Sequence, residues 1–225
     1  MTSSVHFSRA ALGALTSAVL ALAAGSAQAA TNLVTDGSFE SALLPDGTWQ
    51  NYTGTSLWGW DAAGDGVEIR RNVVGTAQDG LYFAELDSLS NTRISQTLDT
   101  QVGQTYQLSF WVSSRAVDPD KNWPAPGGVI PVSSQGLAWN VGAGDVAIAA
   151  LPLNTSTDNQ WQQVITTFTA TSAHTTLSFQ ALGTSDTFGT SLDNISVTAV
   201  PEPASASLLL AGLAAVGSLS RRRRR

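Results

Sequence analysis

The sequence predicts an all-β domain of the sandwich or barrel class, and three observations support that prediction. Apolar and polar residues alternate with a period of two, most clearly in the segment 106–113, and this is the period of a half-buried strand. Turn signals such as Asp79-Gly80 and Val102-Gly103 separate such segments. Between its two ends the sequence does not sustain the 3.6-residue period of a helix. Short strands separated by turns in this way are typical of a β-sandwich or barrel.

The alternation places candidate strands along most of the chain. In order, they cover residues 67–71, 81–87, 93–98, 106–113, 137–141, 145–150, 162–170, 176–181 and 194–199. The longest irregular stretch, 115–135, is rich in proline and glycine, and loops of that length in compact domains are usually functional or disordered.

The first 29 residues read as a secretory signal peptide. Arg9 precedes an apolar run of about 15 residues, and Ala27-Gln28-Ala29 forms a small-x-small cleavage site. We expect the Sec translocon to export the chain and a signal peptidase to cut after Ala29. The alternative is an uncleaved N-terminal anchor, and the short apolar run and the cleavage triplet argue against it.

The last 26 residues form a second targeting segment. Pro201, Glu202 and Pro203 precede an uncharged apolar run, 204–219, and the chain closes with Arg221–Arg225. The run would form a helix of roughly 24 Å, which is short for a bilayer core of about 30 Å. These residues alone leave open an ordinary tail anchor, or a basic tail on a buried helix.

The order of these C-terminal parts closely resembles the PEP-CTERM sorting signal. The resemblance implies that an exosortase, a membrane protease, acts on the tail after transient anchoring by the C-terminal transmembrane helix. It also implies export across the inner membrane of a Gram-negative-type bacterium to the cell surface or extracellular matrix, in association with exopolysaccharide or biofilm. The expected domains are a signal peptide 1–29, a β-domain 30–199 and a sorting signal 200–225.

Composition narrows the function of the β-domain. The chain has no cysteine, which excludes thiol catalysis, cysteine metal sites and disulfides. Between Ala30 and Val200, sixteen acidic residues stand against five basic ones. Such a domain repels nucleic acid, whereas acidic clusters on an exported protein suit calcium.

Three stretches resemble the galactose-binding-like jelly rolls, a group that includes many carbohydrate-binding modules. The opening 32–40 is similar to their first strand, the stretch 94–110 to their central hairpin, and 192–197 to their last strand. The resemblance implies a jelly-roll β-sandwich, flanked here by an N-terminal signal helix and a C-terminal hydrophobic helix. The fold alone does not settle the function, because it is shared by sugar binders, adhesion modules and enzyme appendages.

Glu40 and Asp193 are the candidate metal ligands. Asp193 has the strand parity of Ile195 and Val197, so its carboxylate should point inward, where an unpaired charge is costly. In sugar-binding relatives a structural calcium lies at about this place, which the resemblance carries onto Glu40 and Asp193. The alternatives are that the two carboxylates cap loop amides or pair with Arg93.

Trp111 is the first candidate for ligand binding, because it lies on the polar face of its strand. An exposed tryptophan on a sheet offers a stacking surface to a sugar ring. Arg115, Trp123 and Trp139 are expected to join it. The alternative is that these tryptophans close the ends of the sandwich or pack under the 115–135 loop.

The sequence therefore predicts an exported, non-catalytic protein with a carbohydrate-binding-like domain. Outside the signal peptide His174 is the only histidine, which disfavours a Ser-His-Asp arrangement, and phosphate-loop and zinc spacings are absent. Two alternatives stay open. One is a structural matrix protein without a specific ligand, and the other is a glycoside hydrolase with a carboxylate pair.

Overall fold

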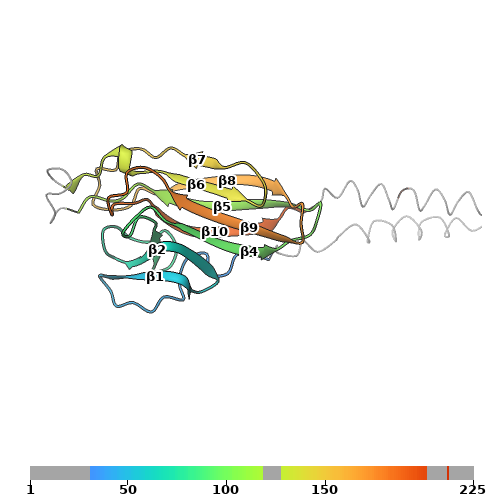
Figure 1. Cartoon of the computed structure of the whole chain (residues 1–225), viewed down its shortest axis with the longest axis horizontal. Coiled ribbons are helices and arrows are strands. Elements are labelled where there is room, and N and C mark those ends of the chain that lie inside the picture. Colours follow the sequence, from blue (N-terminus) through green and yellow to red (C-terminus); the bar gives the residue numbers. More distant parts are fainter. Residues whose placement is uncertain (1–30, 119–127, 202–211, 213–225) are drawn as a thin grey trace, which may run out of the picture. The chain divides into compact units, whose positions relative to one another are not determined.

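The computed structural model describes residues 31–118, 128–201 and 212, and Thr31–Val200 forms one compact unit. The predicted signal helix and the apolar C-terminal helix lie outside the described residues. The strands in chain order are β1 (Thr48–Leu57), β2 (Trp60–Arg71), β3 (Phe83–Glu85), β4 (Arg93–Asp99), β5 (Thr105–Ser113), β6 (Leu137–Val141), β7 (Ala147–Ala149), β8 (Gln162–Thr169), β9 (His174–Ala181) and β10 (Ser191–Ala199), with the short 3-10 helix η3 (Val132–Ser134) before β6 (Figure 1).

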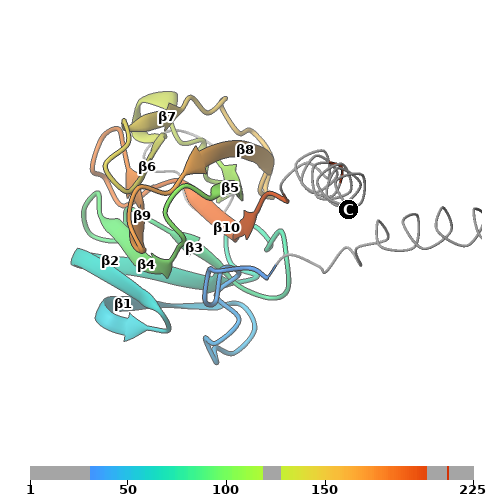
Figure 2. The same cartoon turned by 90° about the vertical axis from the view of Figure 1, so that its right-hand side faces the viewer.

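The ten strands of the described chain form one curled antiparallel sheet. Their order is β7-β6-β9-β4-β2-β3-β10-β5-β8, and β1 pairs with β2 at the side. Figure 2, seen along the strands, shows β6, β9 and β4 across the core from β10, β5 and β8. The ring of Phe110 in β5 lies 4.9 Å from Phe179 in β9 and 5.2 Å from Trp139 in β6, centroid to centroid. Two packed layers around one core confirm the all-β jelly-roll prediction.

The core is built by the predicted alternation. In β5 the residues Tyr106, Leu108, Phe110 and Val112 are buried, while most of their neighbours face outward. β4 and β9 alternate in the same way, with every second residue buried. Fully burying one large apolar side chain stabilises the fold by about 1.5–3 kcal/mol, so this pattern fixes which face of each strand is free for function.

The opening 32–40 is not the strand that the sequence predicts. It makes only a single bridge, from Asn32 to Thr198 of β10. The backbone then turns sharply, because Asp36 and Phe39 adopt φ angles of 50° and 58°, in the left-handed region. The Phe39 amide donates to the Asp36 carbonyl at 3.2 Å. This turn buries the Phe39 ring against Trp60, so packing replaces strand pairing here.

The β1–β2 hairpin was largely missed by the sequence analysis, which predicted a strand only at 67–71. The register of the two strands shifts on both sides of Gly54, which interrupts the alternation. Gly66 has a φ angle of 93°, and a Cβ added there would lie 2.3 Å from the Tyr52 carbonyl oxygen. Glycine is therefore required where the strands cross closely, and it hides the strand pattern.

The two ends of the domain meet on β10. The Leu33 amide donates to the Val197 carbonyl at 2.8 Å, next to the Asn32–Thr198 bridge. At the other end, the Val200 amide donates to the Thr105 carbonyl, and Gln104 Nε2 donates to the Val200 carbonyl, each at 2.9 Å. The first and last residues of the domain therefore lie close to each other. Within the described residues, no helix is long and apolar enough to cross a bilayer.

Candidate functional site

Three hollows follow the outward face of β4. The first, of about 320 Å³, is lined by Asp61, Ser95 and Thr97 among others. The second, also of about 320 Å³, and the third, of about 270 Å³, share Arg93 and Gln180 in their walls. We call this surface the β4 groove and define it by the side chains of Asp61, Arg93, Ser95, Asn140, Ser178 and Gln180.

The strand register sets the spacing of the groove side chains. Ser95 of β4 pairs with Asp61 of β2 on one side and with Ser178 of β9 on the other, and Ser178 pairs with Asn140 of β6. These side chains therefore form a row across four strands that lie about 4.8 Å apart. A second row runs from Arg93 to Gln180, which pairs with Ala138. Hydroxyl, amide, carboxylate and guanidinium groups thus face solvent on one surface.

Arg93 is the positive charge of the β4 groove, and it is exposed. Among the arginines that the structure describes, it alone forms no ion pair, since Arg71 lies 3.6 Å from Asp46, and Arg70 and Arg115 pair with glutamates. Its guanidinium group therefore has no ion-pair partner among the described residues.

Glu40 and Asp193, the predicted calcium ligands, meet at one loop between β2 and β3. The Asp193 carboxylate accepts hydrogen bonds from the amides of Gln78 at 2.7 Å and Asp79 at 3.0 Å. Glu40 Oε1 accepts from the amides of Leu81 at 2.8 Å and Tyr82 at 3.0 Å. We call this arrangement the loop clamp. Both carboxylates therefore cap loop amides, which is one of the alternatives that the sequence left open, and Arg93 pairs with neither.

The oxygens of the loop clamp that were predicted to bind calcium accept hydrogen bonds from backbone amides in this structure. Calcium takes six to eight oxygen ligands, and here four loop amides and the Asn194 amide already occupy Glu40 Oε1 and both oxygens of Asp193. No group of three or more His, Cys, Asp or Glu side chains in the described ranges is placed to hold a metal.

Asp193 is nevertheless an unusual carboxylate. It is fully buried, and burial raises the pKa of its carboxyl to about 7, although three backbone amides that donate to it lower that pKa in part. None of the ion pairs in the described part of the chain includes Asp193. The charge state of this residue therefore depends on pH near neutrality.

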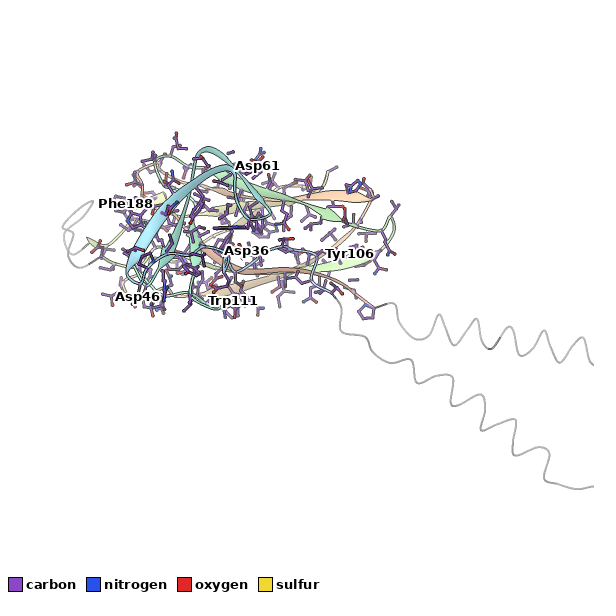
Figure 3. The ribbon with its side chains drawn as sticks, turned by 90° about the horizontal axis from the view of Figure 1, so that it is seen from below. Asp36, Asp46, Asp61, Tyr106, Trp111 and Phe188 are labelled. Atoms are coloured by element: carbon purple, nitrogen blue, oxygen red, sulfur yellow. The ribbon has the colours of Figure 1, made fainter. Side chains whose placement is uncertain are left out.

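Trp111 lies on the outward face of β5, as its parity predicted, and it is half-buried. It pairs with Asp193 of β10 and Gln163 of β8, so it lies in the layer opposite the β4 groove. Figure 3 shows Trp111 and Asp61 at opposite edges of the domain.

The other predicted ligand-binding residues do not gather around Trp111. Trp139 is half-buried in the opposite layer, with its ring edge-on to Phe110, and it also lines one hollow of the β4 groove. Trp123 lies outside the described residues. The predicted tryptophan platform is therefore not assembled by the residues that the structure describes.

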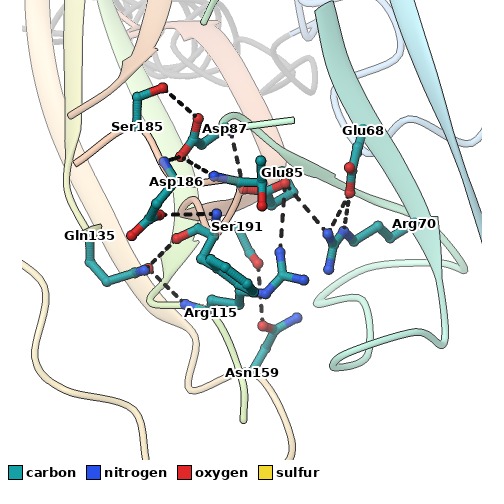
Figure 4. Close-up of polar contacts among 12 residues, drawn as sticks. Glu68, Arg70, Glu85, Asp87, Arg115, Gln135, Asn159, Ser185, Asp186 and Ser191 are labelled. Atoms are coloured by element: carbon teal, nitrogen blue, oxygen red, sulfur yellow. Dashed lines mark hydrogen bonds and ion pairs between the residues drawn. The ribbon is translucent and has the colours of Figure 1, made fainter. Parts of the chain in front are cut away.

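Arg115 was predicted to face a ligand, but it is only 8% exposed. Its Nη1 lies 3.7 Å from Glu85 Oε2, and Arg70 Nη2 lies 3.5 Å from the same oxygen (Figure 4). Arg70 also pairs with Glu68. We call these four residues the buried charge row. The prediction for Arg115 is corrected, because loops cover the end of the sheet where it lies.

Burial shifts the pKa values within the buried charge row. It lowers the pKa of Arg115 to about 10, with the nearby Arg70 charge adding to the effect, and it raises the pKa of Glu85, which is 0% exposed. Gln135 ties the covering loops to the row, since its Oε1 accepts from the Arg115 amide at 2.9 Å and its Nε2 donates to the Phe188 carbonyl at 2.7 Å. Gln135 thus links the loops that carry Arg115 and Phe188.

The β4 groove was missed by the sequence analysis, although its signal was present. The segments 93–98 and 176–181 both alternate, and their polar positions, such as Ser95, Ser178 and Gln180, are groove residues. The sequence does not show that the strands holding them are neighbours, which depends on the β4–β9 pairing.

Two families match the sequence. The family described as Protein of unknown function (DUF642) matches residues 32–198, and the PEP-CTERM protein-sorting motif matches residues 199–225. The second match confirms the predicted sorting signal and indicates export. No curated protein matches the chain.

Solved structures resemble the domain. The Stig cyclase Fisc from Fischerella sp. TAU is 17% identical, with 78% of this chain and 100% of that chain covered and a TM-score of 0.56. TmCBM61, solved in complex with beta-1,4-galactotriose, is 16% identical, with 76% and 99% covered and a TM-score of 0.48. At these identities a likeness shows the fold alone.

Proposed function

The chain belongs to the DUF642 family of proteins of unknown function and ends in a PEP-CTERM sorting motif, and from this premise we propose that it is an exported, non-catalytic protein that binds exopolysaccharide through the β4 groove. The observation that carries the proposal is the groove itself, an open polar face that spans four strands. Its place of action is then the cell surface or the biofilm matrix.

The groove chemistry suits a sugar chain. Ser95 and Ser178 hydroxyls donate and accept, Gln180 offers an amide, and Asp61 accepts, which matches the alternating donors and acceptors of sugar hydroxyls. The lining residues on β4, from Arg93 to Thr97, extend over roughly 13 Å at about 3.3 Å per residue, which favours more than one sugar unit over a single sugar.

The non-catalytic part of the proposal is supported by the charges in the groove. Glycoside hydrolases generally use two carboxyl groups that flank the scissile bond. Asp61 is the acidic residue among those that line the three hollows, and its charged neighbour in the groove is Arg93. Turnover of the polysaccharide by the pure protein would favour the hydrolase instead.

The binding test compares the two faces of the domain. We expect the double variant Asp61→Ala/Gln180→Ala to bind exopolysaccharide from the host at least about tenfold more weakly, since about 1.4 kcal/mol of lost hydrogen bonding is a factor of ten. Trp111→Ala is the control from the opposite layer and should bind normally. Isothermal titration of the exported proteins measures both.

Two other results of this binding test would contradict the β4 groove as the binding site. Loss of binding in Trp111→Ala alone would move the site to the outward face of β5. Equal and negligible binding by every protein would favour a structural matrix protein without a specific ligand.

The processing of both ends is a separate prediction. Val200 is hydrogen-bonded to the domain through its amide and its carbonyl, so a protease is expected to cut beyond it. Mass spectrometry of the secreted protein should show a start at Ala30 and an end after Val200. Glu202→Ala should leave the full chain in the inner membrane, and a secreted wild-type chain that still ends at Arg225 would contradict exosortase processing.

A further inference from the structure

We propose that the β4 groove selects polysaccharides that carry carboxylate groups, and that Arg93 is the residue that determines this specificity. The inference rests on the proposed function and adds the chemical class of the ligand. It predicts a chain of mostly neutral sugars with isolated uronate residues.

The position of Arg93 is the first argument. It is the first residue of β4 and faces outward, and it lines two of the three hollows, of about 320 Å³ and 270 Å³. Its partner in the register, Gln180, lines the same two hollows. A ligand that follows the groove therefore passes the guanidinium group, with an uncharged amide beside it.

The charge environment of Arg93 is the second argument. The domain contains sixteen acidic residues against five basic ones, so most arginines are expected to be paired. Arg70 and Arg115 are buried with glutamates, and Arg71 pairs with Asp46, yet no carboxylate of the described residues lies within ion-pair distance of Arg93. The groove thus keeps one unneutralised, exposed cation.

The chemistry of the guanidinium group selects the partner. Its planar fork of N–H donors matches the two oxygens of a carboxylate, and this bidentate contact is stronger and more directional than one to a neutral hydroxyl. Uronate residues are a common source of carboxylates in polysaccharides. Arg93 can therefore distinguish a uronate from the corresponding neutral sugar.

The net charge of the domain limits how acidic the ligand is. A densely charged polyanion would be repelled by the excess of carboxylates, over a distance of about 8 Å at physiological ionic strength. An isolated uronate gains the contact with Arg93 at a smaller repulsive cost. Added salt should therefore strengthen binding to dense polyanions and weaken binding to sparse ones.

The test uses one polysaccharide in two forms. Exopolysaccharide purified from the host is used native, and again after its uronate carboxyls are reduced to alcohols. We expect the exported wild-type protein to bind the native form about tenfold or more tightly than the reduced form. Arg93→Gln should bind the native form as weakly as wild type binds the reduced form. Its affinity for the reduced form should be unchanged.

Each outcome decides between the claims. Equal wild-type affinity for the two forms would overturn the inference and leave the proposed function standing, whereas binding to neither form would overturn both. Arg93→Lys keeps the charge without the fork and should retain part of the preference. If Arg93→Gln melts as wild type does and still prefers the native polysaccharide to the same extent, another residue makes the selection. That result would overturn the inference.

Discussion

Glu85→Gln is expected to lower the free energy of unfolding by about 3–5 kcal/mol, because it removes the buried charge that Arg70 and Arg115 share. Glu85 is 0% exposed, and its Oε2 lies 3.5 Å from Arg70 Nη2 and 3.7 Å from Arg115 Nη1. Without it, the guanidinium of Arg115 stays buried with no carboxylate within ion-pair distance in the described residues. Chemical denaturation of the exported protein measures the loss.

The matched control is an exposed contact between a histidine and an aspartate of the same chain. His174 Nδ1 lies 3.1 Å from Asp99 Oδ1, and the two side chains are 71% and 93% exposed. His174→Gln is expected to change the free energy of unfolding by at most about 1 kcal/mol. If Glu85→Gln cost no more than this control, the charges of the row would not be buried against each other.

The second large effect is a fall in stability as the pH rises, caused by Asp193. Its pKa is about 7 in the folded protein, against an ordinary value of 3.8. The folded state therefore holds this proton more tightly than the unfolded state, so stability falls as the pH rises from about 4 to 7. The full loss is roughly 4 kcal/mol, at 1.36 kcal/mol for each pH unit.

Thermal melts between pH 4 and pH 8 measure this loss in wild type and in Asp193→Asn. The variant is expected to be less stable throughout, because asparagine offers one acceptor oxygen to the three amides that donate to Asp193. Its stability should nevertheless fall less between these pH values. An equal slope in the two proteins would show that Asp193 does not titrate in this range.

The same melts test the calcium prediction made from the sequence. The loop clamp, with its five amide donors, is expected to melt alike in calcium and in excess chelator. A melting temperature several degrees higher in calcium, lost in Asp193→Asn, would restore calcium as a ligand of Glu40 and Asp193 and contradict the amide-only account.

The strands that bury alternate residues were predictable from sequence. β4, β5, β6 and β10 lie close to where the alternation placed them, because every second residue meets one core. The β1–β2 hairpin was not predictable in this way, since Gly54 and Gly66 interrupt its pattern at the positions where the backbone needs them. The opening turn at Asp36 also looked like a strand, because left-handed φ angles leave no periodic signal.

The acidic residues were the hardest to interpret from sequence. Composition cannot distinguish a carboxylate that binds a cation from one that accepts backbone amides. Asp87 accepts from the amides of Asp186 and Thr187, about a hundred residues further along the chain, and Asp158 accepts from the amide of Thr76. The excess of acid in this domain is therefore partly used to fasten loops.

The functional residues depended on the strand order, which the sequence does not state. Trp111 could be selected from the sequence because the alternation of a single strand is enough to place it on the polar face. The β4 groove needs β2, β4, β9 and β6 to be neighbours, and only the sheet order shows that they are. Arg115 was misplaced for a related reason, because the residues that bury it, such as Gln135 and Glu85, lie far from it in sequence.

The most direct test of the central claim is to map the ligand on the two layers by nuclear magnetic resonance. The isotope-labelled exported protein is titrated with oligosaccharides cut from the host exopolysaccharide, and the backbone amide shifts are followed. The account predicts saturable shifts at Arg93, Ser95 and Gln180, with none at Ser109, Trp111 and Gln163 of the opposite layer. Shifts confined to β5 and β8 would contradict it.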